Sequence, residues 1–263
     1  MTARERARRH IAGVALLLST AAWALYLTQA APSSASAFCW GSAATGAWPS
    51  LQSVLQVYPP QGLAADWLLM LVAMMLPTLV APLLHVHQRS FRHRRSRAIA
   101  LFVFGYFSVW MLAGVALILL QLSTHVSAPG SHWPAAIAAL LALVWQCSPA
   151  KQLCLNRSHQ HDALAAFGGC ADRDALGFGL KHGLWCVGSC WALMLMPLLI
   201  TAGHTAAMLA ATVVMSAERL EGPRPLQWRL RGLGKLCRIV AARLPRSPSA
   251  RPAEPRARAT AVP

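Results

Sequence analysis

The amino-acid sequence predicts an all-α membrane protein, a polytopic bundle of about six helical spans with both termini in the cytoplasm. The first observation behind this is composition. Of 263 residues, 56% are hydrophobic and only 12% are charged, against roughly 25% charged residues in ordinary soluble domains. The second is the placement of charge, because all 24 lysines and arginines fall in four blocks, at 4–9, 89–97, 151–181 and 219–258.

The placement of the basic residues predicts how the chain is oriented in the membrane and argues against a nucleic-acid-binding function. Long windows without Lys or Arg separate the blocks, at 10–88, 98–150 and 182–218. Basic residues favour the cytoplasmic side of a membrane, so we expect each block to mark a return of the chain to that side. A nucleic-acid-binding domain would spread its basic residues over a folded surface. We therefore expect no nucleic-acid partner, despite a formal net charge of +16.

The apolar windows divide into helices of spanning length, since about 20 apolar residues cross the bilayer core. We expect a basic N-terminus at 1–10 and a membrane domain at 11–220. Within that domain the predicted spans are 11–31, 66–84, 98–122, 134–147, 179–200 and 204–217. Two alternatives stay open. Residues 1–37 also fit a cleaved signal peptide, and the short window 182–218 also fits a re-entrant pair.

A basic amphipathic helix is predicted at 221–245, after the last span. Apolar residues recur there at helical spacing from Leu226 to Leu244, with arginine and lysine on the other faces. Such a helix lies on the anionic lipid headgroups of the inner leaflet. Pro245 would end it, and the remainder, 246–263, has the Arg-, Pro- and Ala-rich composition typical of disorder.

The side chains that could bind a metal ion or take part in chemistry lie on the fifth predicted span. His182, Cys186, Cys190 and Met194 are spaced four apart and therefore form one stripe along a helix. Imidazole, thiol and thioether groups together suit Cu(I), and suit Zn(II) less well. The alternative is packing, because cysteine and methionine are also common core residues.

Two other spans repeat this spacing with soft side chains. Met70 and Met74 are four apart on the second span, and His204 and Met208 are four apart on the sixth. Together with the fifth span they would line a path for a soft metal. A second tier of candidate ligands comes from the sixth span and from the exit of the fourth: Cys147, Cys154, His204, Met208.

A proline, two carboxylates and the lack of enzyme motifs give further expectations about the backbone and the class of function. Pro77 is expected to kink the second span and to free a backbone carbonyl there. Asp66 and Glu218 fall at predicted span ends, where a carboxylate is solvated, which counts against a proton-driven transporter. No nucleotide-binding loop, serine nucleophile motif or dinucleotide fingerprint is present, so we expect no enzyme.

Several sequence blocks carry a resemblance to a known family. They are Trp67–Met70 with Ala73–Pro77, Gly105–Tyr106 with Trp110, Trp145–Gln146 with Pro149, Lys151, Cys154 and Leu155, then Gly183, Cys186–Gly188, Cys190–Met194 and Glu218. In these blocks the chain resembles an uncharacterised bacterial family described as predicted metal-binding integral membrane proteins, sometimes labelled copper chaperones. The resemblance covers roughly 66–219 and implies a multi-pass protein of the bacterial inner membrane.

The chain departs from that family pattern at three positions. Ser158 stands where the family usually has a second cysteine in the inner loop. Ser189 stands where a cysteine usually precedes Cys190, and His204 where a methionine is common. The loss of two thiols implies a changed ligand set or weaker metal binding.

The leading hypothesis is a membrane protein that binds a soft metal, with copper preferred to zinc. It would act in metal handling or in the assembly of a membrane metalloenzyme. The alternatives are a structural or scaffold subunit whose sulfur atoms only pack, and a metal transporter that works as a homo-oligomer. The candidate ligands are Cys186, Cys190, His182 and Met194, with Met70 and Met74 as relay sites.

Overall fold

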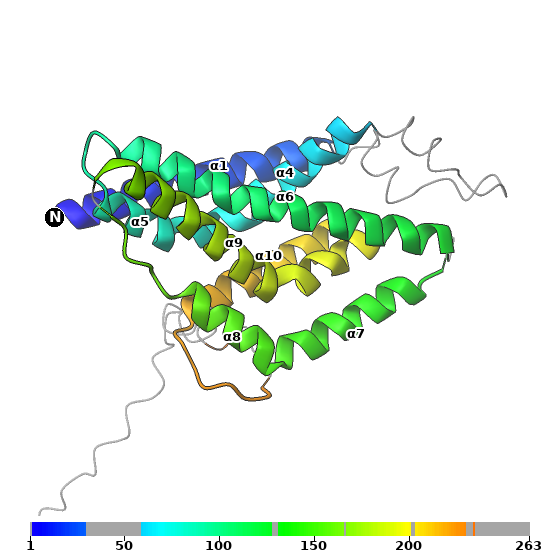
Figure 1. The fold of residues 1–263 in the computed structure, drawn as a ribbon. Coiled ribbons are helices and arrows are strands. Elements are labelled where there is room, and N and C mark those ends of the chain that lie inside the picture. Colours follow the sequence, from blue (N-terminus) through cyan, green and yellow to red (C-terminus); the bar gives the residue numbers. More distant parts are fainter. Residues whose placement is uncertain are drawn as a thin grey trace, which may run out of the picture.

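The computed structural model describes residues 2–29, 59–127, 131–165, 167–200, 203–229 and 234, and in these ranges the chain forms helices and no strand. The predicted all-α class is confirmed. The helices, shown in Figure 1, are α1 (Ala3–Gln29), α4 (Pro60–Met75), the 3-10 helix η1 (Leu76–Leu79), α5 (Val80–Arg89), α6 (Arg95–Ser127), α7 (Trp133–Cys147), α8 (Pro149–Ser158), α9 (Gly168–Leu199) and α10 (His204–Leu220).

Within the described ranges, four segments are long and apolar enough to cross a membrane: Arg4–Thr28, Pro60–Arg89, Arg95–Thr124 and Gly168–Leu199. They correspond to the first, second, third and fifth predicted spans. The helices α7 and α8 together would form a fifth crossing, bent by 65° at their junction. The predicted sixth span is α10, which is shorter, with 17 residues.

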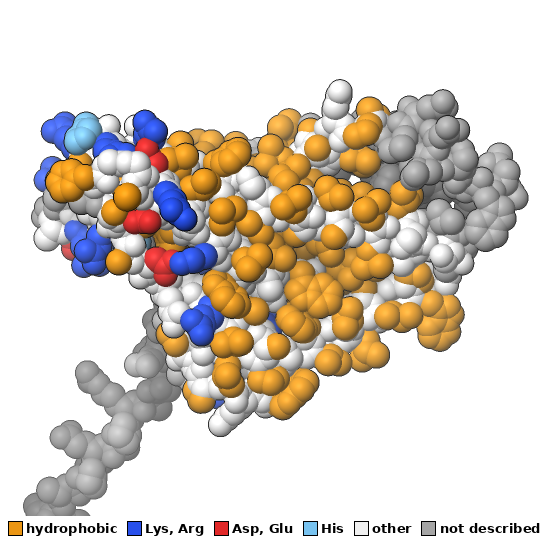
Figure 2. Space-filling model, in the orientation of Figure 1, with side chains coloured by type: hydrophobic (Ala, Val, Ile, Leu, Met, Phe, Trp, Pro, Cys, Tyr) orange, Lys and Arg blue, Asp and Glu red, His pale blue; other side chains and the backbone are white. Residues whose placement is uncertain are grey.

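Charged and apolar side chains separate along the molecule. The start of α1, the turn between α5 and α6 and the chain before α9 lie at one end (Figure 1). On the face shown in Figure 2, lysine, arginine and acidic side chains gather at that end, and apolar side chains cover most of the rest. Large apolar side chains are well exposed along the helices, among them Leu17, Leu112 and Ile137. A surface of this kind suits a lipid environment.

Two predictions for loop and tail segments are wrong. The predicted inner loop 151–178 is mostly helical, because Ser148 caps α8 by accepting a hydrogen bond from the Lys151 amide and proline occupies its first turn. The predicted tail helix does not begin at 221. Residues 221–229 form no helix and lie against α7 and α8, where Asn156 and the Cys147 carbonyl bond their backbone.

Of the tail beyond 229 only Gly234 is described. The rest of the predicted tail helix and the tail 246–263 lie outside the described residues, as does most of the predicted outer loop after the first span.

Pro77 has the effect on the backbone that the sequence predicts. It lies in η1, which separates α4 from α5, and its missing N–H leaves the Ala73 carbonyl without its helical donor. The hydroxyl of Ser19 in α1 donates to that carbonyl at 2.6 Å. A serine on a neighbouring helix thus restores the bond that proline removes, as an apolar bundle requires.

The core of the bundle is the contact between α6 and α9. Glycine residues on both helices allow the two backbones to approach closely. A Cβ atom at Gly179 would overlap the Phe102 carbonyl oxygen, and one at Gly105 would lie 2.7 Å from the Leu176 carbonyl oxygen. Small residues at such contacts let helix backbones approach closely. The helix α9 also contacts α7, α8 and α10, so its buried face is enclosed on several sides.

We predict that Gly179→Ala destabilises the fold by about 1–3 kcal/mol, because the added methyl group forces α6 and α9 apart. Gly177, two residues earlier on α9, has open space around its Cα. Gly177→Ala is the matched control and should be neutral or stabilising by up to about 1 kcal/mol. Thermal unfolding in detergent measures both variants, and equal stabilities would contradict the close packing at Gly179.

Candidate metal centre

Two buried thiols lie one turn apart on α9. Cys186 and Cys190 are free cysteines with 1% and 2% of their surface exposed. A spacing of four makes their side chains neighbours on one face of the helix, and the Cys186 sulfur lies 3.2 Å from the Tyr106 hydroxyl. The sequence prediction that these thiols share one stripe with His182 and Met194 is confirmed, since all four are buried on the same helix.

The helix α6 supplies the aromatic wall of this thiol pair. Tyr106 and Trp110 are one turn apart and fully buried. The buried indole N–H of Trp110 has no hydrogen-bond partner in the described part of the chain. A buried N–H donor without a hydrogen-bond partner is unfavourable, so the Trp110 indole favours an electron-rich acceptor beside the two thiols.

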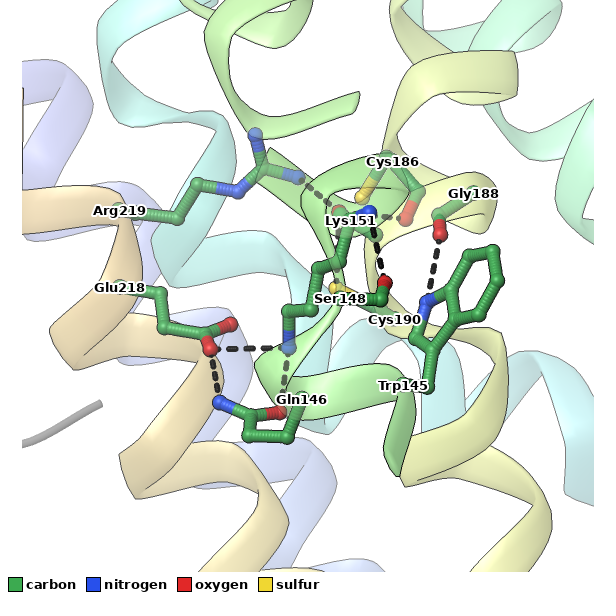
Figure 3. A network of polar contacts seen from close by, with 10 residues as sticks. Trp145, Gln146, Ser148, Lys151, Cys186, Gly188, Cys190, Glu218 and Arg219 are labelled. Atoms are coloured by element: carbon green, nitrogen blue, oxygen red, sulfur yellow. Dashed lines mark hydrogen bonds and ion pairs between the residues drawn. The ribbon is translucent and has the colours of Figure 1, made fainter. Parts of the chain in front are cut away.

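A cationic side chain from α10 also reaches the thiol pair. Figure 3 shows the guanidinium of Arg219 directed from α10 toward the Cys186 turn. It donates to the Ser158 hydroxyl, and to the Ser189 hydroxyl at 3.3 Å. Ser189 in turn lies 3.3 Å from the Cys190 sulfur. The sequence placed Arg219 at the start of a basic tail, and nothing in its spacing indicated this contact.

A second polar network lies beside the thiol pair and is electrically neutral. Lys151 of α8 and Glu218 of α10 form an ion pair at 2.8 Å, with 0% and 1% of their side chains exposed. Gln146 of α7 bonds both, donating to Glu218 and accepting from the Lys151 ammonium at 2.6 Å (Figure 3). The expectation that Glu218 is solvated at a span end is therefore wrong, because α8 folds back and buries its partner lysine.

His182 lies one turn before Cys186 and is buried within a cage of rings. The centroids of Phe102, Tyr106 and Phe178 are 5.9 to 6.0 Å from its own. The methionines on α4 and α10 share the same hydrophobic core, with Met70, Met74 and Met208 all buried.

The second-tier cysteines differ in their distance from the thiol pair. The Cys154 sulfur lies against the Cα of Gly188, where an added Cβ would be 2.8 Å away, and Gly188 falls between Cys186 and Cys190 in the sequence. Trp145 holds the same turn by donating to the Gly188 carbonyl at 3.1 Å. Cys147, at the end of α7, is half-buried.

His204 serves a structural purpose at the start of α10. Its Nδ1 donates to the Pro197 carbonyl at 2.7 Å, which leaves Nε2 to accept from the Tyr26 hydroxyl at 2.7 Å. Both nitrogens are thus engaged in tying α1 to the junction of α9 and α10. Across the described ranges no three His, Cys, Asp or Glu side chains converge as a metal-binding group. The centre therefore offers two thiols rather than a four-ligand set.

Comparison with known proteins gives one match. The family model PpoB2, described as a copper chaperone, matches residues 64–241. This range includes α6 to α10 and with them every residue of the thiol centre. No curated protein and no solved structure matches the chain significantly.

The buried ion pair gives a test of the network around the centre. Glu218→Gln leaves the Lys151 ammonium buried without a counter-charge and should cost about 3–5 kcal/mol of unfolding free energy. Replacing both partners, with Lys151→Met and Glu218→Leu, should recover most of that loss.

The matched control for this test is an exposed ion pair. Lys181 and Asp162 pair at 2.9 Å with 68% and 43% of their side chains exposed, so Lys181→Gln should leave the free energy of unfolding nearly unchanged. Denaturant unfolding in detergent compares all variants. A loss in Glu218→Gln as small as that in Lys181→Gln would show that the buried network contributes little.

Proposed function

The chain belongs to the PpoB2 copper chaperone family, and on this basis we propose that it is a membrane protein that binds Cu(I) between the thiolates of Cys186 and Cys190. Copper is the cargo in this proposal. The chain would take it up and pass it on in metal handling or in the assembly of a metalloenzyme.

The main support for the proposal is that the thiols of Cys186 and Cys190 are buried and neighbouring on one face of α9. Thiolates are soft ligands that select Cu(I), and Cu(I) is stable with fewer ligands than the tetrahedral set of four that structural Zn(II) takes. Since no third strong ligand group of the described ranges converges on the pair, its chemistry favours copper over zinc. His182 and Met194 continue the stripe on either side, and both are suited to pass a soft ion along α9.

We further propose that the bundle spans the bacterial inner membrane about six times. The charged end described above would face the cytoplasm, as the clustering of basic residues favours. The chain would then cross outward through α1, α6 and α9 and return through α4–α5, α7 and α10. In this arrangement the thiol pair lies inside the bundle, out of contact with lipid.

Copper binding tests the proposal directly. Protein purified under reducing, anaerobic conditions and loaded with Cu(I) should retain about one copper ion per chain, as measured by mass spectrometry of metals. Cys186→Ser with Cys190→Ser should abolish that copper, because the hydroxyl groups are hard, weak ligands for Cu(I).

The control for copper binding is Cys170→Ser, which removes an exposed thiol from the first turn of α9 and should leave the bound copper unchanged. Copper far below one per chain in the parent protein, or equal copper in the parent and the double variant, would refute the proposal.

The orientation is tested by thiol labelling. With Cys170 as the single cysteine, a membrane-impermeant maleimide should label inverted membrane vesicles and leave intact cells unlabelled, because Cys170 is exposed near the charged end. A single cysteine at 39, in the predicted outer loop, should give the opposite pattern. Labelling of Cys170 in intact cells would overturn the orientation.

A further inference from the structure

We propose that Arg219 determines the metal specificity of the thiol centre, because its guanidinium balances the charge of a bis-thiolate complex with a monovalent ion. This inference rests on the proposed function and adds a residue to it. Arg219 would act on the metal through charge, without being a ligand.

Arg219 is held in place by groups from two other helices. Its guanidinium donates to the hydroxyls of Ser158 of α8 and Ser189 of α9, and the Ser189 hydroxyl lies 3.3 Å from the Cys190 sulfur. These contacts fix the cation beside the thiols although the residue itself belongs to α10. A long side chain loses considerable rotamer entropy when it is held in this way, so a cation anchored at several points is a specific feature of the centre.

The charge of the metal complex depends on the oxidation state of the ion. When a metal ion binds the pair, both thiols release their protons and become thiolates. A monovalent ion between two thiolates leaves a net charge of minus one, which the guanidinium cancels. A divalent ion leaves the complex neutral and the guanidinium without a counter-charge. Arg219 is half-buried, and a charge in such a position without a counter-charge is costly, so the centre with Arg219 favours the monovalent ion.

The neighbouring charges do not replace Arg219 in this balance. Lys151 is also close to the centre, but its charge is matched by Glu218. Within the described ranges, Arg219 forms no ion pair with a carboxylate. Tyr106 and Trp110 contribute neutral donors. Within these ranges, Arg219 is therefore the cation beside the thiols that lacks a carboxylate partner.

The experiment compares monovalent and divalent ions on the same reduced, full-length protein in detergent. Affinities for Cu(I), for the redox-inert Ag(I) and for Zn(II) are measured by competition with chelators. Arg219→Gln should weaken Cu(I) and Ag(I) binding by at least about tenfold and leave Zn(II) binding unchanged or tighter. Arg219→Lys, which keeps the charge, should restore most of the preference. Arg97→Gln, which removes an exposed arginine, should change neither affinity.

The inference is overturned if Arg219→Gln keeps the parent ratio of Ag(I) to Zn(II) affinity, or if Arg219→Lys fails to restore it. If Arg219→Gln does not fold, Ser158→Ala with Ser189→Ala decides. That variant keeps the charge but frees the guanidinium, and an unchanged ratio there also overturns the inference. Failure of the proposed function has a different signature, in which the parent protein binds no Cu(I) or the double cysteine variant binds it equally well.

Discussion

A polar group inside an apolar bundle must find its partner within the protein, and this constraint explains most of the contacts described above. The Ala73 carbonyl, freed by Pro77, is bonded by Ser19. The last carbonyls of α9 accept from Gln121 and His204. Lys151 and Glu218 neutralise each other at the junction of α7, α8 and α10. Most of these contacts join residues that are distant in the sequence, so satisfying the polar groups also fixes the packing.

The thiol centre depends on how closely its neighbours approach α9. Glycines on the two helices bring α6 against α9, which places Tyr106 and Trp110 beside the thiols. On another side, the absence of a side chain at Gly188 makes room for the Cys154 sulfur, and the indole of Trp145 donates to the Gly188 carbonyl. Larger residues at these positions would separate the helices and open the centre. The chemistry of the pair therefore follows from backbone proximity as much as from the cysteines themselves.

The parts of the structure that follow from local spacing could be predicted from the sequence. A spacing of four places His182, Cys186, Cys190 and Met194 on one face of a helix, whatever the tertiary structure. The charged residues of the centre could not be found in this way. Lys151 and Arg219 belong to basic blocks that indicate topology. The burial of Lys151 and the contact of Arg219 with Ser158 depend on α8 folding back after Cys147. The sequence Ser148–Pro149 suits both the end of one helix and the start of the next, and only tertiary packing distinguishes the two.

Ser158 and Ser189, which stand where the family that the chain resembles usually has cysteines, have a shared consequence for how this centre can change by substitution. Ser158 and Ser189 come from different helices, yet both accept a hydrogen bond from the guanidinium of Arg219. A hydroxyl is a much better acceptor for that cation than a neutral thiol is. Restoring one cysteine would remove an anchor of the arginine while adding a sulfur donor beside the existing pair. The three positions are thus coupled, and substitutions at them are expected to be inherited together.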